Sequence, residues 1–282
     1  TIRMRQDGRQ GGKAAPANAV NQTVLASVAT TDFPHVLAAK KEISNWNFMQ
    51  LNPEILREPT RYEVNLDDKI GHSGENLAAA LYRIKEESAY NLQLISFKLN
   101  SFLPEFTSVD VLDDTANKQF LIRLKNEDGK VFTSRVLSEG TLRLLTLCIL
   151  LYDDKYQGLL CFEEPENGIH PFRIATMVEL LRELSTSFEK GESLRQVIVN
   201  THSPVFLRVL KTHFNDEDIF VSIWFSKLTT KLITKEEGKR KLRTSKMVPL
   251  TKDLQYSFSE ADIKMTIADA TRYLESQERM EV

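Results

Sequence analysis

The sequence predicts an α/β protein in which helices flank a mostly parallel sheet, and three observations carry this prediction. Helix-type and strand-type segments alternate between residues 138 and 225, as they do in open parallel sheets. The strand-type runs are almost entirely apolar, as expected of strands buried on both faces. Polar residues directly follow these runs. Because ligands of such sheets bind off the carboxyl ends of the strands, these polar residues are the candidates for function.

The composition of the 282 residues is typical of a globular protein, with 41% hydrophobic and 27% charged residues. The 37 basic and 39 acidic residues leave a net charge of -2, which gives no global reason to coat nucleic acid or an anionic membrane. Cys148 and Cys161 both lie in apolar runs, which fits a reducing compartment. The sequence has no apolar stretch of membrane-spanning length and no signal-peptide core, so we expect a cytoplasmic protein without a membrane partner.

The first segment, residues 1–60, predicts an N-terminal arm followed by short helices. Residues 1–19 are rich in Gly, Ala, Arg and Gln without periodicity, which is typical of a loop or mobile arm. Short apolar clusters then predict helices that end near Pro53 and Pro59. The chain begins with Thr rather than Met, and we therefore expect a portion of a longer polypeptide.

Residues 61–282 predict one larger lobe, which begins with a strand over residues 61–66. A helical insertion follows over about residues 73–105, where Ser73 is a candidate N-cap. Apolar residues of its first helix share one face: Leu77, Leu81 and Ile84.

The core of this lobe spans about residues 119–225. Residues 119–137 alternate as a hairpin of two strands, and a polar turn then opens a long apolar helix that runs to about Tyr152. The segments after it alternate in type: strand 158–164, helix 171–188, strand 195–200, helix 203–214 and strand 219–225.

The C-terminal segment, residues 226–282, predicts further strands and a final helix. Apolar residues recur at helical spacing near the end of the chain: Ile263, Ile267 and Ala270. The basic stretch 235–246 has two interpretations. A solvated basic loop between strands is favoured over a contact with nucleic-acid phosphates.

Three polar motifs follow strands or open helices. The first, LSEGTLR at 137–143, is a Ser-x-Gly turn that presents backbone N–H groups and a hydroxyl at a positive helix end, which suits an anion. A helix N-cap at Ser138 is the alternative interpretation, and it is the favoured one for an isolated motif.

The second motif, LLCFEEPENGIHP at 159–171, places two acids where a strand leaves the sheet. Adjacent side chains of a strand point to opposite sides, so one of Glu163 and Glu164 can serve a divalent cation and the other an activated water. A solvated acid pair is the alternative, but it does not explain the polar residues Glu166 and Asn167 that follow.

The third motif, VIVNTHSP at 197–204, ends another buried strand with polar residues that include His202. A lone histidine there is more often structural than functional. The three motifs together, each at a strand end or helix start, predict a nucleotide-hydrolysis site at one sheet edge.

These motifs, in this order, resemble the C-terminal lobe of an ABC-type ATPase. The branch is the AAA_21-like group of predicted ATPases, which is related to the structural-maintenance-of-chromosomes, RecF and overcoming-lysogenization-defect proteins. LSEGT is similar to the signature motif, FEEPENG to the Walker B strand and D-loop, and NTHSP to the switch-histidine strand. The resemblance covers roughly residues 20–225, and it implies a P-loop NTPase fold of the ABC-type head.

The resemblance also implies roles for individual residues. Glu164 stands where the family has the general base, and His202 stands at the switch histidine that contacts the γ-phosphate of ATP. Glu163 stands at the residue that orients Mg2+ through a water. The positions implied to bind nucleotide, either at the signature turn facing the opposite subunit or in the D-loop, are Ser138, Glu139, Gly140, Thr141, Glu166 and Asn167.

The chain departs from the family pattern at three points. Glu163 replaces the usual Asp, and Glu139 replaces a signature glycine, which places an acid near phosphate. No G-x-x-x-x-G-K-[ST] motif occurs; GRQGGKAA at 8–15 lacks both the first Gly at the required spacing and the hydroxyl residue after the Lys. We therefore expect the chain by itself to bind ATP poorly or not at all.

Three functions are compatible with these features. The leading one is an ATPase that dimerises head to tail through ATP as a homodimer or higher homo-oligomer, in DNA-associated repair or anti-phage defence. Its possible partners are DNA and an effector subunit such as a nuclease or toxin. The alternative is a non-hydrolysing regulatory or scaffold subunit, which the missing P-loop favours. A nuclease of the overcoming-lysogenization-defect type is disfavoured, because only scattered acids follow His202.

Overall fold

The computed structural model describes residues 2–5, 12–15, 23, 25–28, 33–64, 69–186, 194–213, 221–235, 238–251 and 265–278, and it confirms the predicted α/β class. The elements of the main body, in chain order, are α1 (Pro34–Ser44), β3 (Asn47–Met49), α2 (Pro53–Arg57), β4 (Thr60–Arg61), α3 (Leu77–Glu87), α4 (Ala89–Phe102), β5 (Phe106–Asp114), β6 (Gln119–Asn126), β7 (Val131–Thr133), η1 (Ser134–Val136), α5 (Glu139–Leu151), β8 (Gly158–Glu163), η2 (Pro171–Arg173), α6 (Ile174–Leu184), β9 (Arg195–Asn200), α7 (Pro204–Leu210) and η3 (Lys211–His213).

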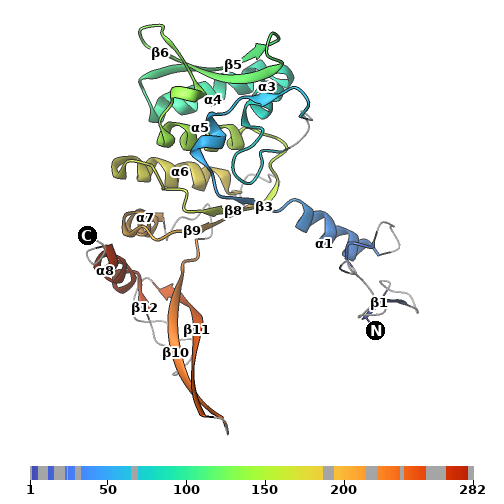
Figure 1. Cartoon of the computed structure of the whole chain (residues 1–282), viewed down its shortest axis with the longest axis vertical. Helices are drawn as coiled ribbons and strands as arrows, with labels where there is room; N and C mark the ends of the chain where they lie inside the picture. Colours follow the sequence, from blue (N-terminus) through green and yellow to red (C-terminus); the bar gives the residue numbers. More distant parts are fainter. Residues whose placement is uncertain are drawn as a thin grey trace.

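The main body is built in layers, which Figure 1 shows from top to bottom. An antiparallel sheet in the order β4-β6-β5, with β7 paired to β6, lies over helices α3 and α4. Helices α5 and α6 form the next layer, and they lie on a parallel sheet in the order β3-β8-β9. The strands β8 and β9 of this sheet carry the predicted Walker B and switch-histidine motifs. Because these strands are parallel, the polar residues of both motifs lie at the same end of the sheet, with Glu163 opposite Asn200.

The two faces of the parallel sheet differ in burial. Leu160 and Phe162 of β8 point into the core and are 0% and 2% exposed. The alternate positions form a row across the three strands, with Phe48 in register with Cys161 and Cys161 in register with Ile198. Phe48 and Ile198 are 57% and 56% exposed. Helices therefore cover one face of this sheet, and the other face presents apolar side chains to solvent.

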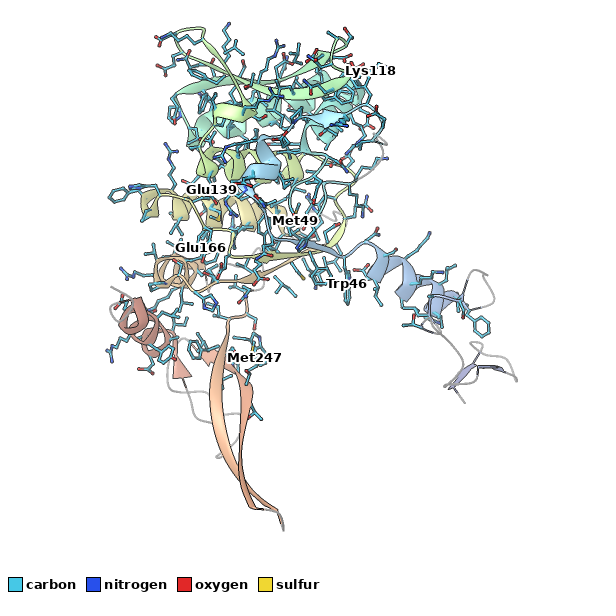
Figure 2. The ribbon with its side chains drawn as sticks, viewed as in Figure 1. Trp46, Met49, Lys118, Glu139, Glu166 and Met247 are labelled. Atoms are coloured by element: carbon cyan, nitrogen blue, oxygen red, sulfur yellow. The ribbon has the colours of Figure 1, made fainter. Side chains whose placement is uncertain are left out.

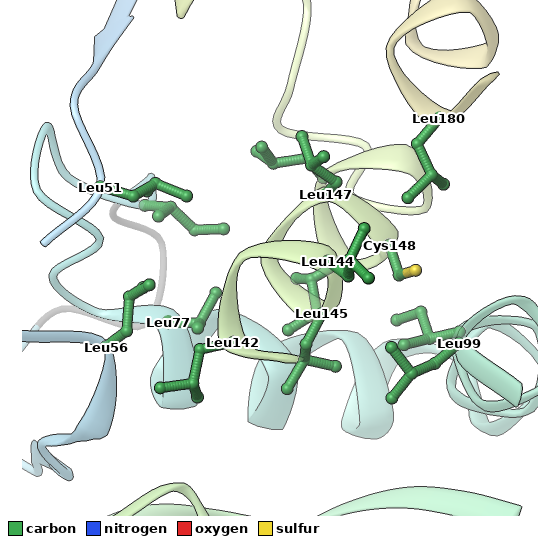
Figure 3. Close-up of a cluster of buried hydrophobic side chains, with 14 of the residues drawn as sticks. Leu51, Leu56, Leu77, Leu99, Leu142, Leu144, Leu145, Leu147, Cys148 and Leu180 are labelled. Atoms are coloured by element: carbon green, nitrogen blue, oxygen red, sulfur yellow. The ribbon is translucent and has the colours of Figure 1, made fainter. Parts of the chain in front are cut away.

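Helix α5 is the centre of the hydrophobic core. Its residues from Thr141 to Leu150 are all buried, as expected of a helix that is apolar on every side and surrounded by other elements. Figure 3 shows Leu144, Leu147 and Cys148 of this helix between Leu99 of α4 and Leu180 of α6. Each such leucine contributes about 1.5–3 kcal/mol through burial. The signature-like turn is therefore held at the start of a rigid helix.

An ion pair lies inside this core. Both carboxylate oxygens of Asp153 accept hydrogen bonds from Arg83 Nη2 at 2.9 Å. The Asp153 and Arg83 side chains are 3% and 5% exposed, so the pair ties α3 to the turn after α5 without leaving a buried charge uncompensated.

The C-terminal elements form a separate unit below the parallel sheet. They are β10 (Trp224–Lys235), β11 (Gly238–Thr251), β12 (Met265–Thr266) and α8 (Ile267–Glu278). Ile267 and Ala270 are buried against Leu207 of α7 and Leu250 of β11, which confirms a C-terminal helix with these residues at helical spacing. Ile263 lies outside the described residues.

Two predictions for this unit are wrong. The strand predicted over residues 219–225 is described from residue 221 on, and this part does not join the parallel sheet; β10 begins at Trp224 and pairs antiparallel with β11. The described part of the basic stretch 235–246 is not a loop, because Lys235 ends β10 and residues 238–246 belong to the strand Gly238–Thr251, in register with β10. Lysine-rich segments carry a weak strand signal, and cross-strand pairing decides their structure.

The N-terminal half also departs from the predictions. β1 (Ile2–Arg5) and β2 (Gly12–Ala15) pair as a short hairpin in the segment expected to be a loop. Pro53 begins α2 instead of ending a helix, because proline is favoured in the first turn. The strand predicted over residues 61–66 is confined to Thr60–Arg61 in the described part, since a turn follows at once.

The cap of the first insertion helix differs as well. The N-cap of α3 is Asn76, in the left-handed conformation at φ 67°, and not Ser73. The backbone N–H of Ser73 instead donates to the Glu75 carboxylate at 2.9 Å. The predicted apolar face is confirmed, because Leu77, Leu81 and Ile84 are all buried. None of the helices in the described part of the chain has the length and apolar character that crossing a bilayer requires.

Candidate active site

Glu163 is the last residue of β8 and is exposed at the carboxyl end of the strand. It is in register with Asn200, the last residue of β9, whose side-chain amide lies 3.5 Å from Glu163 Oε1. The alternation along β8 places Glu163 on the same face as Cys161, which is the face that helices α5 and α6 leave open. Its carboxylate is therefore accessible to a metal ion at the carboxyl end of the central strand.

Glu164 leaves the strand by a left-handed turn. Its φ of 43° is uncommon for a residue with a side chain and costs of order 1–3 kcal/mol, which is tolerated where the surroundings hold it. The N–H of Glu164 donates to the Asn200 carbonyl at 2.8 Å, so β9 provides this support. The carboxylates of Glu163 and Glu164 therefore have different neighbours, Asn200 for the first and Asn167 and His202 for the second.

The Glu164 carboxylate lies between two other predicted site residues. Asn167 Nδ2 donates to Glu164 Oε2 at 2.7 Å. His202 Nε2 lies 3.7 Å from Glu164 Oε1, and the His202 side chain is 75% exposed. One carboxylate oxygen is thus fixed by an amide, while the other faces an accessible imidazole. This arrangement can orient a water molecule and accept its proton.

Glu166 turns inward and supports the histidine loop. Its Oε1 accepts a hydrogen bond from Thr201 Oγ1, and Thr201 Oγ1 accepts from the Ser203 N–H at 3.0 Å. Its Oε2 is buried and has no hydrogen-bond partner among the described residues. These bonds support the loop on both sides of His202, while the imidazole itself stays 75% exposed, 3.7 Å from Glu164 Oε1.

The signature-like turn forms a regular helix start. Ser138 is the N-cap of α5, and its Oγ accepts from the Thr141 N–H at 3.2 Å and lies 2.8 Å from Thr141 Oγ1. The N-cap interpretation is therefore confirmed. It does not conflict with anion binding, because the backbone N–H groups of Glu139 and Gly140 remain at the positive end of the helix.

Glu139 is held by a buried arginine. Arg143 donates to Glu139 Oε1 from Nε at 3.1 Å and from Nη2 at 2.8 Å, and its Nη2 also donates to the Leu51 carbonyl at 3.0 Å. The Arg143 side chain is 7% exposed. The acid that replaces a signature glycine is therefore neutralised within its own helix (Glu139 is labelled in Figure 2). An anion at the turn does not meet an uncompensated carboxylate.

Two glycines bring the signature-like turn against the loop that follows β8. A Cβ on Gly140 would lie 3.0 Å from the Gly168 carbonyl oxygen. A Cβ on Gly168, at φ 69°, would lie 2.5 Å from Glu139 Cγ and 2.6 Å from Glu139 Oε2. A side chain at Gly140 would displace the Gly168 carbonyl by a few tenths of an ångström, and one at Gly168 would require the Glu139 side chain to move. Segments that are distant in sequence therefore pack together as one surface.

The structure thus assembles all three motifs. Glu164, Asn167 and His202 form one cluster, Glu163 lies at the adjacent strand end, and the Ser138 turn contacts the same loop at Gly168. The roles implied for these residues stay predictions. The candidates did not include the contributions of Asn200 and Thr201, although both stand beside His202 in the third motif.

One residue of this site, Glu163, is suited to hold the Mg2+ that the resemblance implies. Among the described residues, no three His, Cys, Asp or Glu side chains converge into a ready metal cluster. Mg2+ does not need one, because it is commonly held by one or two carboxylates, with waters and substrate phosphates completing its shell. The exposed Glu163 carboxylate matches that requirement. A groove of about 590 Å³ between α6 and α7 contains none of these carboxylates.

The class of protein follows from a family match, which identifies an AAA domain. Residues 35–208 match the family described as "AAA domain, putative AbiEii toxin, Type IV TA system", which has the short name AAA_21. This match covers more than half of the chain, so the chain belongs to that family. The family expected from the three motifs is therefore confirmed. No curated protein matches the chain.

The solved structures that match the chain include SMC heads. The Smc head domain with a coiled coil and joint from Pyrococcus yayanosii shows 12% identity and a TM-score of 0.38, over 67% of this chain and 29% of that chain. An SMC ATPase from a study of ATP-driven dimerization and DNA-stimulated activation shows 15% identity and a TM-score of 0.41, over 70% of this chain and 97% of that chain. An SmcHead bound to the C-winged helix domain of ScpA shows 14% identity and a TM-score of 0.42, over 77% of this chain and 61% of that chain.

Proposed function

We propose that the chain supplies the hydrolytic residues of an ATPase that works as a head-to-tail homodimer closed by ATP. The observation that carries this proposal is the cluster at the end of β8 and β9. There Asn167 holds one oxygen of the Glu164 carboxylate at 2.7 Å, and the other oxygen lies 3.7 Å from His202 Nε2. A carboxylate and an imidazole in this relation suit the activation of a water for attack on a phosphoryl group.

Each residue has a distinct part in this proposal. Glu164 Oε1 takes the proton of the attacking water, and Asn167 keeps the carboxylate in place. His202, in the loop that Glu166 and Thr201 support, contacts the terminal phosphate. Bound ATP and Mg2+ would supply the transferred phosphoryl group and the neutralisation of its charge, with Glu163 holding the metal.

The open face of the parallel sheet supports completion of the site by a P-loop lobe. Parallel sheets are almost always covered on both faces. Here the row of Phe48, Cys161 and Ile198 is uncovered, and Glu163 lies at the end of the same face. A lobe that packs on this row would bring its phosphate-binding loop beside the acid pair. The signature-like turn at Ser138 would then close the site of a second copy.

We propose a biological setting that the description of the family supports. The description of the family names a toxin and a Type IV toxin–antitoxin system. We place this chain in a DNA-associated repair or anti-phage defence system, where an ATP-driven conformational switch controls an effector such as a nuclease or toxin.

A second candidate is a non-hydrolysing regulatory or scaffold subunit. The absence of a G-x-x-x-x-G-K-[ST] motif from the sequence favours it, because the motif provides the phosphate cradle, its lysine and the hydroxyl that binds Mg2+. The supported position of Glu164 opposes it, since a subunit without hydrolysis has no need to hold a strained carboxylate beside a histidine.

The test is Glu164→Gln in the complete protein together with its P-loop lobe. Loss of a general base slows the reaction by about 10²–10⁴-fold, so ATP turnover should fall by that factor. The variant should also retain ATP and elute as a dimer in size-exclusion chromatography. Unchanged turnover would remove Glu164 from the role of base.

The control is Glu127→Gln, which removes an exposed acid in the β6–β7 turn, far from the sheet edge. We expect wild-type turnover from this variant. If the wild-type protein with its P-loop lobe binds its partners but never hydrolyses ATP, the scaffold function replaces the ATPase.

A further inference from the structure

The antiparallel ribbon of β10 and β11 is a feature that the ATPase site does not use. The two strands stay in register from Trp224 opposite Pro249 to Lys235 opposite Gly238. At about 3.4 Å per residue, the 12 residues of β10 span about 40 Å. Figure 1 shows the ribbon extending away from the parallel sheet and the helical layers.

The ribbon has a strong positive charge. No Asp or Glu occurs in the described strands, which carry eight basic residues: Lys227, Lys231, Lys235, Lys239, Arg240, Lys241, Arg243 and Lys246. The two residues between the strands, Glu236 and Glu237, lie outside the described part. Even with them the segment 224–251 has a net charge of +6, whereas the rest of the chain carries 29 basic and 37 acidic residues. Positive charge is therefore concentrated on this one element.

The register spreads the basic positions over both faces of the ribbon. Arg240 pairs with Ile233, while Lys241 pairs with Leu232, and neighbouring positions along a strand belong to opposite faces. Lys227 and Lys246 are direct cross-strand partners. Like charges directly opposite each other destabilise a two-stranded ribbon. An anionic partner that reaches both faces would relieve this repulsion.

The root of the ribbon is anchored to the body, whereas an isolated hairpin of this kind is marginally stable in water. Val248 and Leu250 are 8% and 5% exposed, and Leu250 packs with Leu207 of α7. The Phe225 and Tyr273 rings meet edge to face with centroids 5.5 Å apart. The ribbon thus has a fixed base and an extended basic arm.

We propose that this ribbon, made of the strands Trp224–Lys235 and Gly238–Thr251, is an arm that binds duplex DNA. A two-stranded ribbon fits the major groove of B-form DNA, which is about 12 Å wide, and basic positions on both faces then lie beside the phosphates of both groove walls. Duplex RNA offers a narrow, deep major groove that does not admit such an arm. A membrane surface is disfavoured, because an interfacial element needs one continuous apolar face and this ribbon is basic on both.

DNA binding by the ribbon does not depend on the ATPase function. Binding through phosphate contacts needs no nucleotide, so it is measured on the full 282-residue chain without ATP. If Glu164→Gln left ATP turnover unchanged, the proposal of DNA binding by the ribbon would still stand. The reverse also holds, because the ribbon contributes none of the residues of the acid and histidine cluster.

The experiment measures fluorescence anisotropy of a labelled DNA duplex of mixed sequence, about 30 base pairs long, across a salt series. The ribbon variant carries Arg240→Gln, Lys241→Gln and Arg243→Gln. Each phosphate contact contributes about 0.9 to the slope of log K against log salt, so the slope should decrease by about 2.7. Affinity near 0.1 M salt should fall at least about tenfold. Circular dichroism of the variant confirms that the fold is retained.

The control variant removes the same number of charges from exposed lysines in or next to β6, which Figure 1 shows at the opposite end of the molecule: Lys118→Gln, Lys125→Gln and Lys130→Gln. It should bind DNA within about twofold of wild type, because those positions lie outside the arm. Equal losses in the two variants would show a net-charge effect and overturn the proposal. Equal or tighter binding of duplex RNA, or of vesicles containing phosphatidylserine, would overturn it as well.

Discussion

Replacement of Gly168 by Ala tests whether the signature-like turn and the loop after β8 form one packed unit. Gly168 has a φ of 69°, and a Cβ at this position would lie 2.5 Å from Glu139 Cγ. A side chain can fit only if Glu139 moves. Glu139 is held by Arg143 at 2.8 Å, so movement separates a carboxylate from a guanidinium that is 7% exposed.

The expected cost has two parts. The left-handed conformation of a residue with a Cβ costs about 1–2 kcal/mol, of which about 0.4–1 kcal/mol is offset by the lower entropy of the unfolded chain. Displacement of Glu139 adds about 1.5–3 kcal/mol for a hydrogen bond to a charged group. We therefore expect Gly168→Ala to lower the free energy of unfolding by about 2–4 kcal/mol.

Urea denaturation, followed by circular dichroism, measures this change. Gly129→Ala is the matched control, because Gly129 has a φ of 79° but a Cβ there meets nothing closer than Lys125 Cε at 3.7 Å. It should cost about 1 kcal/mol or less, from the backbone conformation alone. In addition, Glu139→Ala should reduce the effect of Gly168→Ala, since it removes the atoms that clash. Equal costs for the two glycine variants would refute the packing argument.

Two further predictions concern titration and accessibility. Burial alone would raise the pKa of Asp110, but hydrogen bonds from Lys85 and Arg123 at 2.9 and 2.6 Å lower it below the ordinary value of 3.8. Ionised Asp110 thus stabilises the fold above pH 3.8, and this stabilisation is lost as the pH falls through the lowered pKa. Asp110→Asn should therefore lower the free energy of unfolding at neutral pH but not in strong acid. Urea titrations that find the same loss of stability at both pH values would contradict this prediction. Cys161 lies on the open sheet face and Cys148 is 0% exposed, so maleimide should modify Cys161 alone in the native protein. The reaction should become faster as the pH rises, because partial burial raises the pKa of the Cys161 thiol and the thiolate is the reactive form. Mass spectrometry that finds Cys148 modified first would refute the assignment of the open face.

Local pattern was sufficient for the elements that bury long apolar runs. The strands 158–163 and 195–200 and the helix after Ser138 are where the sequence predicts them, because periodicity and apolar length alone specify them. Pattern was insufficient for β3, which has three residues and exists through its parallel pairing with β8. Pattern was also insufficient for β11, because its lysines and arginines have low strand propensity and the strand is stabilised by its pairing with β10.

The sequence by itself determined the chemistry of the site: an acid pair after one strand, a histidine after the next, and a Ser-x-Gly turn at a helix start. Short-range rules were enough, because strand ends and helix caps depend on neighbouring residues. Only the tertiary structure decided which groups support them. The hold of Arg143 on Glu139, the contact of Thr201 with Glu166 and the close approach of Gly140 to Gly168 all join residues through packing. Such contacts depend on the whole fold, so local sequence patterns do not predict them.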